Sequence, residues 1–98
     1  MVEIGLVKPK PPIDYFIGPH AAFEMARRGL DAEIIRRVLA GPEQQVKVRE
    51  GRVIFQSRVM LGRPERTYLV RIVVDVDRWP AEVVTVYRTT KIAKYWRR

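Results

Sequence analysis

The sequence predicts an α+β fold of two layers, in which an N-terminal αα-hairpin packs on one face of a four- to five-stranded antiparallel sheet. A short C-terminal helix follows the sheet. Apolar residues recur at helical spacing between residues 20 and 40, and they alternate with polar residues from about residue 45 to residue 88. Because strands joined in succession by short turns pair antiparallel, the second segment predicts a sheet that the hairpin can cover.

Both helices of the hairpin have recognisable ends. The first is predicted over residues 20–28 and stops at Gly29, the residue type that most often closes a helix. Asp31 is a suitable N-cap for the second helix, over residues 32–40, which the Gly41-Pro42 pair terminates. The link between them is only three residues long, so the two helices form an αα-hairpin.

The other elements are strands, identified by alternation between turn residues. The predicted strands cover residues 13–17, 45–49, 52–60, 67–76 and 82–88. From Lys91 onward the chain changes character, because Ile92, Tyr95 and Trp96 recur three and four positions apart. We therefore expect a short cationic helix with an aromatic side after the last strand.

Length and composition indicate one domain. The chain has 98 residues, of which 47% are apolar, enough for one modest core. We assign residues 13–98 to the domain and residues 1–12 to an N-terminal arm that ends in a proline-rich connector. The sequence has no apolar run long enough to cross a membrane and no secretory leader, so we expect a cytoplasmic protein with no membrane partner.

The residue types present narrow the possible chemistry. The chain has no cysteine and a single histidine, which excludes disulfides and cysteine nucleophiles and argues against a zinc site. We expect no metal and no cofactor. The net charge is +8, from 19 Lys and Arg residues against 11 acids, which favours RNA or another polyanion as partner. A surface rich in ion pairs is the alternative, although it does not explain the excess of one sign.

Alternation predicts which cations share the sheet face that the hairpin leaves open. In the most apolar strand, Ile72 and its alternate neighbours face the helices, so Arg71 is expected on the open face. The last strand is ambiguous, but the side of Val84 and Val86 is the more apolar. That assignment places Tyr87 outward, beside Arg71.

The predicted site has a reacting set and a binding set. Arg58 and Arg71 are expected to stabilise charge on a phosphate, and Tyr87 or Lys91 to move a proton. The cations expected to bind the nucleic-acid strand are Lys47, Arg49, Arg88 and Lys94. RNA supplies its own nucleophile, the 2′-hydroxyl, so this chemistry requires no metal.

Alternatives remain open for these residues. Each cation is also compatible with the ordinary solvated face of a half-buried sheet. His20 and Glu24 lie one helical turn apart and suit either an acid–base pair or a simple hydrogen bond, and we favour the hydrogen bond. A binding module without chemistry needs the same basic face but no convergence of tyrosine, lysine and arginine.

Several motifs follow one another between about Asp14 and the C-terminus. They are His20-Ala21, Met25, Arg28-Gly29-Leu30, Val38-Leu39, Pro42-Glu43, Tyr68-Leu69-Val70-Arg71, Thr85-Val86-Tyr87-Arg88-Thr89, Lys91-Ile92 and Lys94-Tyr95-Trp96. This series resembles a bacterial family of small domains of unknown function. The order of elements is also similar to that of the RelE/ParE toxin superfamily, a likeness of fold alone.

The second resemblance implies a function. RelE-like members are mRNA endonucleases that use basic residues and often a tyrosine on the open sheet face, whereas ParE-like members lack that set and inhibit DNA gyrase. The resemblance to this superfamily implies RelE-like roles for Arg58, Arg71, Tyr87 and Lys91. It also implies an antitoxin partner with an acidic or amphipathic segment. We therefore predict a RelE-like toxin or toxin-derived metal-independent endoribonuclease, with a non-catalytic, ParE-like binding module as the alternative. Whether the chain forms a homodimer stays open.

Overall fold

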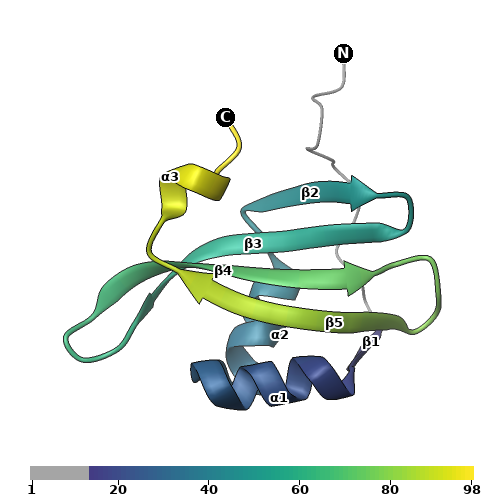
Figure 1. The fold of residues 1–98 in the computed structure, drawn as a ribbon, viewed down its shortest axis with the longest axis horizontal. Coiled ribbons are helices and arrows are strands. Elements are labelled where there is room, and N and C mark those ends of the chain that lie inside the picture. Colours follow the sequence, from purple (N-terminus) through teal and green to yellow (C-terminus); the bar gives the residue numbers. More distant parts are fainter. Residues whose placement is uncertain (1–13) are drawn as a thin grey trace.

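The alternating segments form one five-stranded sheet in the computed structural model, which describes residues 14–98 (Figure 1). The strands are β1 (Tyr15–Ile17), β2 (Gln44–Arg49), β3 (Arg52–Leu61), β4 (Arg66–Asp75) and β5 (Ala81–Thr89). The helices are α1 (Pro19–Arg28), α2 (Ala32–Ala40) and α3 (Ile92–Tyr95). The arm predicted over residues 1–12 lies outside the described residues. No helix among the residues described is long and apolar enough to cross a membrane.

The sheet is mixed, with strand order β1-β5-β4-β3-β2. Strands β2 to β5 pair antiparallel in succession, as predicted. Strand β1 pairs parallel with β5, with Tyr15 beside Ala81, so the prediction of a purely antiparallel sheet is wrong at this edge. The hairpin argument applies only to strands joined by short turns, and both helices and three strands separate β1 from β5.

The two predicted helices and their ends are confirmed. Gly29 adopts the left-handed conformation (φ 65°), which glycine reaches without a side-chain clash, and Leu30 N–H then bonds back to the Met25 carbonyl. Asp31 caps α2 by accepting a hydrogen bond from Ile34 N–H at 2.9 Å. The hairpin thereby turns the apolar sides of both helices toward the sheet.

The core lies between these helices and one sheet face, called here the helix face. Phe55, Ile72 and Val86 lie in register across β3, β4 and β5, and each is at most 1% exposed. The helix-side half of the core includes Ala21, Leu30, Ile35, Val38 and Leu39. Figure 1 shows α2 crossing behind the strands and α1 running along β5. Burying these apolar side chains is the main driving force for the fold.

A β-bulge decides the orientation of β5. Val73 pairs with Thr85 and Val74 with Val83, so β5 contains one extra residue at Val84. Val83 and Val86 therefore face the helices together, and both are fully buried. The expectation for Val84 was wrong, because simple alternation cannot anticipate an inserted residue.

The register of β2 also differs from the expectation. Lys47 lies opposite Val53, a residue of the helix face, so its predicted position on the opposite face is wrong. Val46 lies on that opposite face instead, across from Ile54, and is buried. Alternation failed because Gln45 is a buried polar residue facing Phe55, and one such residue reverses the assignment of a short strand.

The sheet face opposite the helices, called here the α3 face, is not fully open. Tyr95 of α3 stacks above Arg71, and Arg71 and Gln56 are 6% and 0% exposed. Figure 1 places α3 at the end of the sheet where β5 ends. The predicted basic face is therefore partly covered by the chain's own C-terminal segment.

Candidate functional site

Arg71 and Tyr87 meet on the α3 face. They occupy directly opposite positions on β4 and β5, and Arg71 Nη1 donates a hydrogen bond of 2.5 Å to the Tyr87 hydroxyl. The bulge in β5 makes this possible. Val83 faces the helices, and the extra residue in the bulge lets Thr85 and Tyr87 lie on the opposite face, which carries Arg71. The structure thus brings together two of the four residues predicted to react.

The Arg71 guanidinium is held by neutral groups. Its Nε donates to Gln56 Oε1 at 2.7 Å, and its carbon lies 4.3 Å from the centre of the Tyr95 ring. No carboxylate forms an ion pair with Arg71 among the described residues. A buried charge without a counter-charge is costly, and stacking on an aromatic ring compensates it only in part. The site therefore favours an anion nearby.

Gln56 connects this arginine to the C-terminal segment. Its side-chain nitrogen donates to Gln44 Oε1 at 2.8 Å and to the Tyr95 carbonyl at 3.2 Å. Gln44 in turn bonds the backbone of Arg97 at both N–H and carbonyl. Because the amide of Gln56 uses both its donors and its acceptor, this buried group is satisfied, and it fixes α3 over Arg71.

Helix α1 adds a third group beside Tyr87. The Arg28 guanidinium lies 6.0 Å from the centre of the Tyr87 ring and donates to Glu24 at 2.7 Å. The pKa of Glu24 is lowered by hydrogen bonds from Arg27 and then Arg28, so this buried carboxylate stays charged. Within the described part of the chain, no interaction joins Glu24 to His20, so neither the acid–base pair nor the expected hydrogen bond forms.

The other two residues predicted to react lie apart from Arg71 and Tyr87. Arg58 forms a forked pair with Glu43, at 3.1 and 2.9 Å, and its guanidinium carbon lies 4.3 Å from the centre of the Trp96 ring. Its hydrogen bond lowers the pKa of Glu43. The backbone N–H of Lys91 bonds to Thr89, and Lys91 is exposed beyond β5.

The predicted binding cations are dispersed over the surface. Lys47 pairs with Glu50 at 3.0 Å, and Arg49 donates to the Glu50 carbonyl, so both lie at the β2–β3 turn. Lys94 lies 5.3 Å from the centre of the Tyr95 ring and is the one of the four near Arg71. Arg88 lies on the helix face, opposite Val70, because it follows Tyr87 in the strand.

Charge is segregated along the sheet. At the β4–β5 turn, Asp75, Asp77 and Glu82 pair with Arg52 or Arg78. Residues 83–98 instead contain cations and no acid. These cations are Arg88, Lys91, Lys94, Arg97 and Arg98. None of them forms an ion pair with another described residue, so the excess positive charge gathers at the end of the sheet that carries α3.

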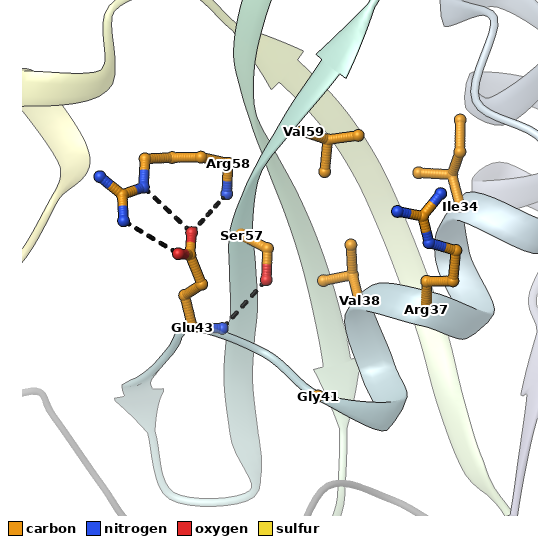
Figure 2. A pocket seen from close by; sticks show the side chains of 8 residues that line it. All are labelled: Ile34, Arg37, Val38, Gly41, Glu43, Ser57, Arg58 and Val59. Carbon is orange, nitrogen blue, oxygen red and sulfur yellow. Dashed lines mark hydrogen bonds and ion pairs between the residues drawn. The ribbon is translucent and has the colours of Figure 1, made fainter.

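A pocket of about 260 Å³ lies between the end of α2 and β3 (Figure 2). Ile34, Val38 and Val59 form its apolar wall, with Arg37 beside them. On the other side, Glu43 N–H donates to Ser57 Oγ at 3.0 Å, and Glu43 receives Arg58. The Glu43–Arg58 ion pair thus lines one side of the pocket, and the two charges of the pair neutralise each other.

Alternation and charge do not identify Gln56, Tyr95 or Arg28 as site residues. Gln56 lies two residues before Arg58 in β3 and so on the same face, and its position opposite Arg71 follows once the β3–β4 register is known. The contribution of Arg28 depends on how α1 lies along β5, which periodicity does not give. No group of three His, Asp or Glu side chains able to hold a metal ion occurs in the described part of the chain.

Comparison with known proteins gives a match over most of the chain. The family model described as a domain of unknown function, DUF4258, matches residues 17–88, from the end of β1 to Arg88 of β5. The match spans α1, α2 and both strands that carry Arg71 and Tyr87. No curated protein and no solved structure matches the chain.

Proposed function

The chain belongs to the DUF4258 family, a domain of unknown function, and on that premise we propose that it is a metal-independent endoribonuclease whose centre is the Arg71–Tyr87 pair. The observation that carries this proposal is the hydrogen bond from the Arg71 guanidinium to the Tyr87 hydroxyl. It joins a buried cation without a carboxylate partner to a group that can move a proton.

The bond fixes the direction of the Tyr87 proton. A guanidinium has only donors, so the Tyr87 oxygen accepts from Arg71 and its own hydrogen points to another acceptor. No other described residue accepts that hydrogen. The half-buried Tyr87 hydroxyl is therefore a positioned proton donor, and Arg71 is the residue that positions it.

The reaction follows from the chemistry of RNA. The 2′-hydroxyl oxygen attacks the adjacent phosphorus and loses its proton to water, forming a 2′,3′-cyclic phosphate. The bond from phosphorus to the 5′-oxygen breaks, and Tyr87 gives its proton to that leaving oxygen. Arg28, 6.0 Å from the centre of the Tyr87 ring, and Lys94, 5.3 Å from the centre of the Tyr95 ring, would stabilise the phosphate.

The same proposal covers biological context. We infer a bacterial, cytoplasmic toxin of RelE-like type, supported by the order of elements, the net charge of +8 and the tyrosine–arginine pair on the sheet. An antitoxin with an acidic segment would suit the cationic end of the sheet, through charge complementarity.

A specific observation favours a second candidate, a non-catalytic module that binds a polyanion. Arg71 is only 6% exposed and Lys91 lies outside the cluster, so fewer groups converge than a RelE-like site needs. Binding requires the cationic end of the sheet but not the Tyr87 proton.

The two candidates differ in a growth experiment. Induced expression of the wild type should arrest bacterial growth and fragment total RNA. The Tyr87→Phe variant, which lacks one oxygen atom, should do neither. Tyr15→Phe removes the same atom from β1, where Tyr15 lies beside Ala81 at the other end of β5 from Tyr87, and should behave as wild type. Arrest with intact RNA that survives Tyr87→Phe would reject the nuclease and leave the binding module.

A further inference from the structure

A second cluster of arginine and tyrosine lies on the helix face of the sheet, beyond the two helices. The Arg88 guanidinium carbon is 4.7 Å from the centre of the Tyr68 ring, and that of Arg66 is 6.0 Å from it. Tyr68 lies opposite Val59 and Arg88 opposite Val70, both residues that pack with the core. The cluster is thus on the opposite side of the sheet from Arg71 and Tyr87.

The geometry leaves the arginine donors accessible. A guanidinium stacked on a ring uses its flat face, while phosphate is bound by the N–H groups along its edge. Neither Arg66 nor Arg88 donates a side-chain hydrogen bond or forms an ion pair with another described residue. Arg66 is exposed and Arg88 half-buried, so both edges remain open to a ligand.

An ordinary surface position does not explain this arrangement well. Several arginines elsewhere in the domain have acidic partners, such as Arg36 with Glu33 and Arg78 with Asp77, whereas the exposed Arg97 and Arg98 have none among the described residues. At Tyr68 two arginines approach one ring with no acid paired to either in the described part of the chain. Placing like charges together is unfavourable unless an anion binds between them.

The two clusters are neighbours along the chain. Tyr87 and Arg88 are consecutive in β5 and point to opposite faces. The exposed Lys91 lies on the link that leads from the end of β5 to α3. A flexible single strand can pass around this end and contact both faces, whereas a stiff duplex cannot. The ligand that fits is therefore single-stranded RNA.

We propose that Arg66, Tyr68 and Arg88 form a second subsite, which binds the phosphate and base of a nucleotide several positions along the strand from the one held at Tyr87. This inference rests on the proposed function, because it names where the rest of the same RNA binds. The two arginines bind phosphate, and the base stacks on the Tyr68 ring or on the guanidinium over it.

The test measures binding of fluorescent, uncleavable 2′-O-methyl RNA. One single strand has roughly 12 nucleotides, within the range that single-strand sites cover, and the other has roughly 3, enough for one cluster only. Arg66→Gln with Arg88→Gln should weaken binding of the longer strand about tenfold and leave the shorter unchanged. The salt dependence of log K should become shallower by about 1.4, because two phosphate contacts are lost.

The matched control is Arg36→Gln with Arg78→Gln, which removes the same charge from two arginines that pair with carboxylates elsewhere. It should bind both strands as the wild type does. If the Arg66 and Arg88 variant behaves like this control, the subsite is rejected while the proposed function stands. If the wild type binds neither strand, the proposed function fails as well. If the variant does not fold, Arg66→Lys with Arg88→Lys keeps the charge but loses the stacked fork, and unchanged binding of the longer strand would reject the subsite.

Discussion

Arg71 Nη1 donates to the Tyr87 hydroxyl at 2.5 Å from the directly opposite position on the neighbouring strand. Cross-strand opposition fixes both side chains on one face, and Gln56 on the next strand fixes the other edge of the guanidinium. Tyr95 covers the pair from above. The arrangement is therefore held by three strands and by the C-terminal segment together.

Replacing Arg71 by lysine separates positioning from charge. Lysine keeps the positive charge but lacks the planar fork that contacts Gln56 and Tyr87 at once. We expect cleavage of RNA to fall about 100-fold, as expected when a reacting group is misplaced. The affinity for uncleavable RNA should change little, because the net charge is unchanged. An equal loss of affinity and cleavage would show that Arg71 binds rather than positions.

The C-terminal segment should contribute to stability through its aromatic residues. Trp96 is half-buried and receives the Arg58 guanidinium at 4.3 Å. We expect Trp96→Ala to lower the free energy of unfolding by about 1–3 kcal/mol, the combined loss of buried apolar surface and of the cation–π contact. Trp79→Ala is the matched control, because Trp79 is 81% exposed, and it should cost less than about 0.5 kcal/mol. Equal effects in urea unfolding would contradict the docking of this segment.

Acid should destabilise the fold through its paired carboxylates. The hydrogen bond from Arg52 lowers the pKa of Asp75, so the unfolded chain takes up this proton more readily than the folded one. The stabilisation is complete above the ordinary pKa of Asp, about 4, and is lost as pH falls through the lower folded-state value.

Unfolding curves between neutral pH and about pH 2 measure this effect. Asp75→Asn should cost about 1–3 kcal/mol at neutral pH and flatten the fall of stability in acid. Glu65→Gln should leave the curve unchanged, because no ion pair involves Glu65 among the described residues. A wild-type stability that does not fall in acid would refute the role given to these pairs.

Much of the fold could be predicted from local signals. Gly29, Asp31 and the apolar sides of both helices specify the hairpin, because capping and periodicity act within a few residues. The parallel pairing of β1 with β5 could not be predicted, since it joins residues far apart in the sequence. The bulge at Val84 was also missed, because it depends on how β4 and β5 align.

The site was only partly predictable for a related reason. Alternation placed Arg71 and Tyr87 on one face, and the structure shows them in contact. It could not show that Tyr95 covers Arg71, because docking of α3 depends on Gln44 and Gln56 from two other strands. Nor could composition alone show which cations have acidic partners, which is decided by register.

The most direct test is incubation of purified protein with single-stranded RNA in the presence of a chelator, followed by analysis of the product ends. The wild type should cleave and leave 2′,3′-cyclic phosphate and 5′-hydroxyl ends. Tyr87→Phe should cleave about 10²- to 10⁴-fold more slowly, the usual contribution of a general acid, while Tyr15→Phe matches the wild type. Cleavage by Tyr87→Phe at the wild-type rate, or no cleavage by the wild type, would contradict the assignment of the Arg71–Tyr87 pair as a catalytic centre.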